Sequence, residues 1–141
     1  MTLYLLYHKR WVDDVFYDTK IIGIYSSHQR ATDAIERYSY IPGFSEFNTG
    51  FYIDSFDVLC GRKSNSNKKN SIVYLLEGVC LIDSDEMIVS YDIYSNIIAA
   101  IWACVVKKLR RNKQPSKKFY IDRYFIDEDH WKEGFIVIDN P

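Results

Sequence analysis

The side chains that could do chemistry are thinly spread along this chain. It has three histidines and three cysteines, which are His8, His28, His130, Cys60, Cys80 and Cys104. The histidines form no H-x-x-x-H or H-E-x-x-H pair and the cysteines have no C-x-x-C spacing, so neither set predicts a zinc site. An odd number of distant cysteines is typical of buried thiols in a reducing compartment rather than of a disulfide framework.

Carboxylates cluster most closely in Asp127-Glu128-Asp129-His130. Such a run could bind a divalent cation in principle, but successive residues of a strand or turn point in different directions and no calcium-loop spacing follows. We therefore expect a solvated acidic turn. The chain also lacks the G-x-x-x-x-G-K-[ST] and G-x-G-x-x-G loops that bind phosphates. These patterns predict a protein without a catalytic site, a cofactor or a metal, and an enzyme is the least favoured of three functional classes.

A repeat organises the elements that must position these residues. Phe51-Tyr52-Ile53-Asp54 returns as Phe119-Tyr120-Ile121-Asp122, about 70 residues later. Two shorter matches have nearly the same spacing: Tyr4-Leu5-Leu6 with Tyr74-Leu75-Leu76, and Ile24-Tyr25-Ser26 with Ile93-Tyr94-Ser95. The repeat makes Asp54 and Asp122 equivalent. They could face one another as paired carboxylates across a pseudo-twofold axis, although outward residues beside their strands are the simpler interpretation.

Each copy has the pattern of two strands, a helix and a third strand. Apolar and alternating segments predict strands at 3–8, 20–25, 51–58, 72–81, 87–93 and 119–126, and a short last strand at 135–138. A capping box of Ser26 and Gln29 predicts that the first helix begins there, and Pro42-Gly43 predicts its end. The second helix is expected over 96–112, with Ser95 as its cap. Its wide apolar stripe predicts that it is the more buried helix.

These elements predict an α+β fold, in which two degenerate ββαβ units form a mainly antiparallel sheet with two helices packed on it. The units are expected at 1–60 and 71–141, within one compact domain. Between them, 61–70 is polar and basic and contains no apolar side chain, which predicts a solvated linker. The net charge of −1 does not indicate a nucleic-acid partner. No signal peptide or membrane span is recognisable, so we expect a cytoplasmic protein.

Several motifs resemble one known group of domains. They are Tyr4-Leu5-Leu6-Tyr7-His8, Ile22-Gly23-Ile24-Tyr25-Ser26-Ser27, Ala34-Ile35, Pro42-Gly43-Phe44, Gly50-Phe51-Tyr52-Ile53-Asp54 and Asp127 to Phe135, which contains Trp131-Lys132-Glu133-Gly134-Phe135. Together they look like a family of small bacterial domains similar to immunity proteins of polymorphic and contact-dependent growth inhibition toxins. In that family the tryptophan motif directly follows the Gly-Phe-x-Ile-Asp strand, whereas here it follows the second unit. The resemblance implies no catalytic residue. It implies a protein that binds and neutralises a cognate toxin domain.

An acidic, aromatic surface would suit this function. Many such toxins are nucleases with basic clefts, and a surface of this kind can occlude a basic active site. Tryptophans are typical interface anchors. The candidate partner-binding residues are Trp11, Asp13, Asp14, Asp18, Asp127, Glu128, Asp129, Trp131 and Glu133. For any one of them, a solvated acidic loop or a tryptophan packed into the core explains the residue equally well.

The alternative function is a nucleic-acid-binding or regulatory module. Its contacts would come from the basic segment Lys107–Lys118 and the 61–70 linker. A structural explanation competes with it, because cations near the end of a helix stabilise the helix dipole.

Overall fold

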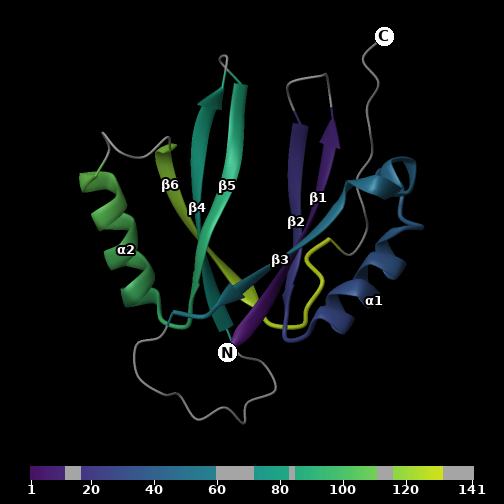
Figure 1. Cartoon of the computed structure of the whole chain (residues 1–141), viewed down its shortest axis with the longest axis horizontal. Coiled ribbons are helices and arrows are strands. Elements are labelled where there is room, and N and C mark those ends of the chain that lie inside the picture. The colour runs from purple at the N-terminus through teal and green to yellow at the C-terminus, as the bar shows by residue number, and fades with distance from the viewer. Residues whose placement is uncertain (12–16, 60–71, 83–84, 111–115, 132–141) are drawn as a thin grey trace.

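In the described residues of this chain, two ββαβ units follow one another (Figure 1). The computed structural model describes residues 1–11, 17–59, 72–82, 85–110 and 116–131. The first unit contains β1 (Thr2–Trp11), β2 (Tyr17–Tyr25), α1 (His28–Tyr38), the 3-10 helix η1 (Ser45–Gly50) and β3 (Phe51–Asp57). The second contains β4 (Ile72–Ile82), β5 (Asp85–Tyr94), α2 (Ile97–Leu109) and β6 (Ser116–Phe125). The predicted α+β class and the two-unit plan are confirmed.

Each unit builds its own three-stranded antiparallel sheet around its first strand. The strand orders are β2-β1-β3 and β5-β4-β6. The pairing is equivalent in detail, since Tyr7 is opposite Tyr52 in one sheet and Glu77 is opposite Tyr120 in the other. The pairing of the first two strands of each unit shifts at the same place, between Leu6 and Tyr7 and between Leu76 and Glu77. The strands therefore divide into two matching sheets rather than one continuous sheet.

The two sheets pack face to face, and one helix covers the outer face of each (Figure 1). Leu5 and Leu75, one from each central strand, belong to the core between the sheets. Their neighbours Leu6 and Leu76 point the other way, into the two sheet–helix cores. A central strand buried on both faces explains the nearly continuous apolar sequence of β1. Burying each such leucine stabilises the fold by about 1.5–3 kcal/mol.

After its last strand, the chain of each unit continues along the other unit and forms a backbone hydrogen bond with it. The Leu59 backbone N–H, just beyond β3, donates to the Ile93 carbonyl oxygen at 2.9 Å. The Asp127 N–H, just beyond β6, donates to the Ile24 carbonyl oxygen at 2.8 Å. Because Ile93 and Ile24 are equivalent in the repeat, the exchange is reciprocal. Neither unit is complete without a segment of the other, in agreement with the predicted pseudo-twofold plan.

Because of this reciprocal exchange, each helix begins one residue later than the sequence predicts. The first cap is Ser27 rather than Ser26, and its side chain accepts from the Arg30 N–H at 3.2 Å. The second cap is Asn96 rather than Ser95, and its side chain accepts from the Ile98 N–H at 2.7 Å. Ser26 and Ser95 are instead bonded to the segments that arrive from the other unit. The predicted caps, Ser26 in its capping box and Ser95, were each one residue too early for this reason.

The remaining predictions about the framework have mixed outcomes. Cys80 and Cys104 are buried thiols, as expected, whereas Cys60 lies outside the described residues. The 61–70 linker and the strand expected at 135–138 also lie outside them. In the described ranges, neither helix has the length and hydropathy that a membrane crossing requires. Those same ranges contain no cluster of three or more potential metal ligands.

Candidate functional site

The predicted acidic and aromatic surface does not form a single patch. Trp11 and Asp18 lie at the far end of the β1–β2 hairpin, where Trp11 is 53% exposed. Asp18 is paired with Lys20 at 2.8 Å. Asp127 lies beside the opposite end of β2, roughly 20 Å from Asp18 at ~3.3 Å per residue. Trp131 lies beside the middle of β2, where Lys20 Nζ is 5.6 Å from the centre of its ring. The other three candidates, Asp13, Asp14 and Glu133, lie outside the described residues.

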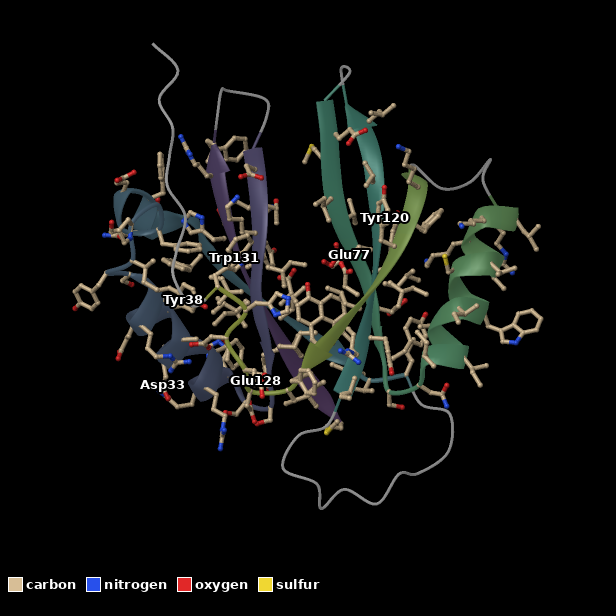
Figure 2. The ribbon with its side chains drawn as sticks, turned by 180° about the vertical axis from the view of Figure 1, so that it is seen from behind. Asp33, Tyr38, Glu77, Tyr120, Glu128 and Trp131 are labelled. Atoms are coloured by element: carbon tan, nitrogen blue, oxygen red, sulfur yellow. The ribbon has the colours of Figure 1, made fainter. Side chains whose placement is uncertain are left out.

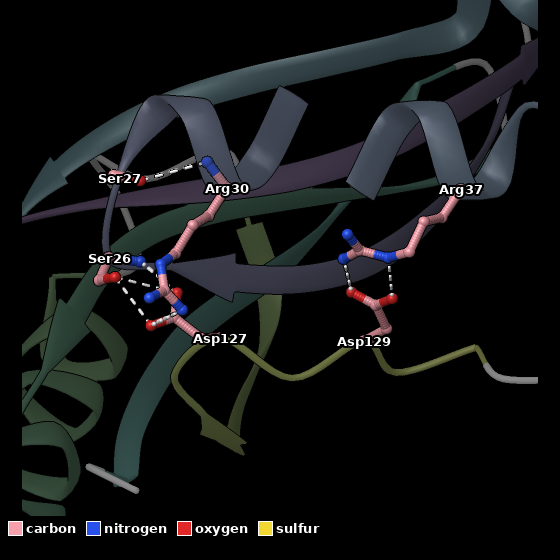
Figure 3. Close-up of polar contacts among 6 residues, drawn as sticks. All are labelled: Ser26, Ser27, Arg30, Arg37, Asp127 and Asp129. Atoms are coloured by element: carbon pink, nitrogen blue, oxygen red, sulfur yellow. Dashed lines mark hydrogen bonds and ion pairs between the residues drawn. The ribbon is translucent and has the colours of Figure 1, made fainter. Parts of the chain in front are cut away.

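The first tail carboxylate, Asp127, is bonded to the start of α1 (Figure 3). It accepts hydrogen bonds from the Ser26 backbone N–H at 2.8 Å and from the Ser26 hydroxyl at 2.7 Å. The Arg30 guanidinium lies 3.2 Å from the same carboxylate. The φ of Asp127 is 65°, in the left-handed region that Asp tolerates better than most residues. Asp127 therefore fixes the tail against α1.

The second tail carboxylate, Asp129, is bonded to the other end of α1 (Figure 3). The Arg37 guanidinium donates to both of its oxygens, at 2.9 and 2.8 Å, in a bidentate pair. The Tyr25 hydroxyl also donates to it. Burial raises the pKa of this hydroxyl, and the bond to the carboxylate raises the pKa further. Tyr25 thus stays protonated and keeps donating across the physiological pH range.

Trp131 is a structural anchor for the same tail. Its indole Nε1 donates to the Ile21 carbonyl oxygen at 2.9 Å, and its backbone N–H donates to the Tyr38 hydroxyl oxygen at 3.0 Å. Burial raises the pKa of Tyr38 to about 12, so that hydroxyl remains neutral. The indole packs against the core between the first sheet and α1. The tail approaches so closely that a Cβ on Gly23 would lie 2.7 Å from the Glu128 carbonyl oxygen.

The tail therefore closes the first unit and offers few groups to a partner. Glu128 is the exposed member among the four tail candidates that the structure describes. One sequence signal could have revealed this arrangement. Arg30 and Arg37 are two turns apart on one face of α1, and Asp127 and Asp129 are two residues apart on an extended segment, so the two pairs can meet.

The largest exposed apolar surface on a helix belongs to α2. Its large side chains point away from the sheet, with Trp102 66% exposed, Ile98 64% and Leu109 82%. The buried residues of α2 are the small Ala100 and Cys104. The prediction that α2 is the more buried helix was therefore wrong. Small residues allow the helix to lie close to the sheet, and the large apolar residues remain exposed.

The repeat provides an internal standard for this surface. Counted from the caps Ser27 and Asn96, the same outward positions carry polar residues in α1 and apolar residues in α2. The pairs are Gln29 with Ile98, Thr32 with Ile101, Asp33 with Trp102, and Glu36 with Val105. An ordinary solvated helix has the α1 pattern, and contiguous exposed apolar groups mark interaction surfaces. We define the α2 face as Ile98, Ile101, Trp102, Val105 and Leu109.

Cations border the α2 face at its C-terminal end. Lys108 and Arg110 are exposed there. Lys107 instead turns back, with its Nζ 4.3 Å from the centre of the Tyr91 ring. The segment from Asn96 to Arg110 contains no acidic residue. The α2 face thus has an apolar centre and a basic edge. Sequence reasoning found the stripe but assigned it to the core, because periodicity alone does not tell which side meets the sheet.

A comparison with known protein families finds a match for part of the chain. Residues 1–65 match a family described as Domain of unknown function (DUF7336). That span contains β1, β2, α1 and β3, and ends before β4. Neither a curated protein nor a solved structure matches the chain. The α2 face and the docked tail both lie outside the matched span.

Proposed function

We propose that this protein is an immunity protein, which binds and neutralises a cognate bacterial toxin domain, and that the α2 face is its main contact surface. The observation that carries the proposal is the difference between the helices. Four outward positions that are polar in α1 are apolar in α2, within one chain and on the same scaffold. Neither folding of α2 nor its contact with the sheet requires these large side chains, because Ala100 and Cys104 fill the buried positions.

The chemistry of the surface specifies the kind of contact. Trp102 at the centre of the α2 face is the natural anchor, since buried tryptophans dominate many interfaces. Lys108 and Arg110 favour carboxylates at the edge of the partner's apolar groove. The bonds that Asp127 and Asp129 make to α1 argue against mimicry of a polyanion. We therefore assign the binding energy mainly to apolar contact, with charge setting orientation and association rate.

The test uses the full chain and the toxin domain encoded beside it. Wild-type protein is expected to protect cells that express the toxin and to bind it one to one. Trp102→Asp should weaken binding by roughly 30-fold or more, since loss of an interface anchor costs about 2 kcal/mol or more. Asp33→Asn, at the equivalent position of α1, is the matched control and should leave protection and affinity unchanged.

Four outcomes would overturn the proposal in whole or in part. Failure of the wild-type protein to protect or to bind would remove the immunity function. Full protection by Trp102→Asp would remove the α2 face as the contact surface. A wild-type dimer that Trp102→Asp converts to a monomer, without any toxin binding, would show that a second copy covers this face. Binding to RNA or DNA at low salt, abolished by Lys108→Glu with no effect of toxin, would favour the nucleic-acid alternative instead.

A further inference from the structure

Side chains of the first unit form an aromatic and charged cluster on the surface between the two sheets. The equivalent positions of the second unit carry different residues. In the first unit, the Tyr7 and Tyr52 rings are stacked, with their centres 5.6 Å apart. Lys9 Nζ lies 5.6 Å and 5.2 Å from the centres of these two rings. The Tyr7 hydroxyl donates to the Asp54 carboxylate at 2.9 Å. The first unit thus provides both the aromatic rings and the cation that rests on them, and Lys9 and Asp54 balance in charge.

The second unit has the same positions with different residues. Glu77 replaces Tyr7, since each is opposite the repeated tyrosine, Tyr120 or Tyr52. Asp122 replaces Asp54, because each is opposite the equivalent leucine of the central strand. The position of Lys9 is taken by Val79, two residues after Glu77. An acid has therefore been added and the cation has been lost, while the tyrosine and the aspartate have been kept.

Glu77 is not stabilised by the fold around it. It is 6% exposed, and its Oε1 atom has no hydrogen-bond partner. Its carboxyl group lies between the two sheets (Figure 2). Ser90, its neighbour on β5, lines a cleft of about 180 Å³ between them together with Tyr7 and Asp54. An unsatisfied buried polar group costs about 1–3 kcal/mol, and more when it is charged. Burial, followed by repulsion from Asp122, raises the pKa of Glu77 to about 7.

We infer that the inner face of the second sheet binds an organic cation, a guanidinium or ammonium group, against the Tyr120 ring and the carboxylates of Glu77 and Asp122. Tyr120 is 49% exposed, so its ring is accessible. A cation over a tyrosine face gains about 0.5–2 kcal/mol, and a carboxylate adds a charge-assisted bond. A guanidinium suits the site best, because it stacks on rings and bonds carboxylates at the same time.

Lys9, the cation that lines the same cleft from the first sheet, lies over the Tyr7 and Tyr52 rings. The remaining charged and titratable groups around the site leave the position beside Tyr120 open. Lys118 precedes Tyr120 by two residues on the same side of β6 and is exposed. In the described structure it forms no ion pair with Glu77 or Asp122 and no ring contact with Tyr120. Burial raises the pKa of Tyr124, which therefore stays neutral. The His130 ring packs on Tyr124 with a centre distance of 4.8 Å. The inference concerns a different surface from the α2 face and stands independently of it.

Binding at this site must be linked to a proton. A cation beside Glu77 favours the ionised carboxylate, so it lowers the pKa of Glu77. Below that pKa, a bound cation displaces a proton. The affinity for the cation should therefore rise as the pH increases from 5 to 8, and the pKa of Glu77 should fall by about one unit at saturation.

The test is an NMR titration of the full chain with methylguanidinium chloride, with potassium chloride at equal ionic strength as the reference. We expect saturable shifts of the Tyr120 ring and the Glu77 carboxyl signals, together with the fall in the Glu77 pKa. Glu77→Gln and Asp122→Asn should each weaken binding by roughly 5-fold or more, and Tyr120→Leu should do so while leaving both acids in place. Asp33→Asn, an exposed acid on α1 away from this cleft, should have no effect. Thermal melts of every variant identify any that is unfolded.

A second ligand distinguishes the two possible sources of the cation, an arginine side chain of another protein and a small free cation. A Gly-Arg-Gly peptide that binds roughly 10-fold more tightly than methylguanidinium would identify an arginine side chain of another protein. Equal affinities would identify a small free cation. Shifts that potassium chloride reproduces, an unchanged Glu77 pKa at saturation, or an equal loss of binding in Asp33→Asn would each overturn the inference.

Discussion

Replacing Glu77 with glutamine should make the protein more stable at neutral and alkaline pH, and the gain should depend on pH. The pKa of Glu77 rises from its ordinary value of 4.5 to about 7 in the folded protein. The unfolded chain therefore ionises this group more easily than the folded chain does. The stability associated with neutral Glu77 is complete below pH 4.5, and it is lost as the pH rises through 7.

The magnitude follows from the size of this shift. Each pKa unit corresponds to 1.36 kcal/mol, so a shift from 4.5 to about 7 corresponds to about 3 kcal/mol. Water that reaches the carboxyl group reduces this value, and the amide of glutamine keeps an unpaired oxygen. We therefore expect Glu77→Gln to increase the free energy of unfolding by roughly 2 kcal/mol at pH 8 and to change it little at pH 5.

The assay is urea unfolding of wild type and Glu77→Gln at half-unit steps from pH 5 to pH 8. The difference between the two free energies of unfolding isolates Glu77 from all other titrating groups. Asp54→Asn is the matched control, because Asp54 is exposed and hydrogen-bonded at the equivalent position. It should show no rise of this kind. Two parallel curves for wild type and Glu77→Gln would refute the claim that Glu77 is buried without a partner.

Four further predictions concern the docked tail and the first core. Trp131→Ala should reduce the free energy of unfolding by about 3 kcal/mol in urea unfolding, because it removes a packed indole and its bond to a backbone oxygen. Asp129→Asn should cost only about 1 kcal/mol in the same measurement, since its partner Arg37 is half exposed, and a loss above 3 kcal/mol would contradict this. Gly23→Val should speed hydrogen exchange in residues 127–131, because a Cβ there would lie 2.7 Å from the Glu128 carbonyl oxygen, and unchanged exchange rates would speak against this close approach. Burial lowers the pKa of His8, so the stability that neutral His8 provides above pH 6.5 should be lost as the pH falls through its lowered pKa, and His8→Gln should remove that part of the acid sensitivity.

Local patterns predicted the elements well and their partners poorly. The continuous apolar run in β1 indicated burial on both faces, and Leu5 and Leu6 are indeed both fully buried. The same run could not tell whether the second face would meet a helix or another sheet, because the covering element is distant in the sequence. For the same reason the two caps were placed one residue early. The bonds that occupy Ser26 and Ser95 come from the other unit.

The candidate site shows the same limit, because local patterns do not reveal which distant residues a side chain contacts. Asp127 and Asp129 were predicted to be available to a partner, whereas the tertiary structure places Arg30 and Arg37 beside them. The α2 stripe looked like core, because a helix that is apolar on most of its surface is usually buried. The sequence did contain the missing signal. Comparing the outward positions of the two repeated helices separates the residues that the scaffold needs from those that it does not.

The most direct test of the central claim is hydrogen exchange measured by mass spectrometry on the protein alone and in complex with the toxin domain. Our account predicts that toxin binding slows exchange in Ile97–Leu109 and leaves His28–Tyr38 unchanged, although the two helices are equivalent in the scaffold. Protection of residues 127–131 and of α1, with no change in α2, would contradict the account and return the binding surface to the acidic tail.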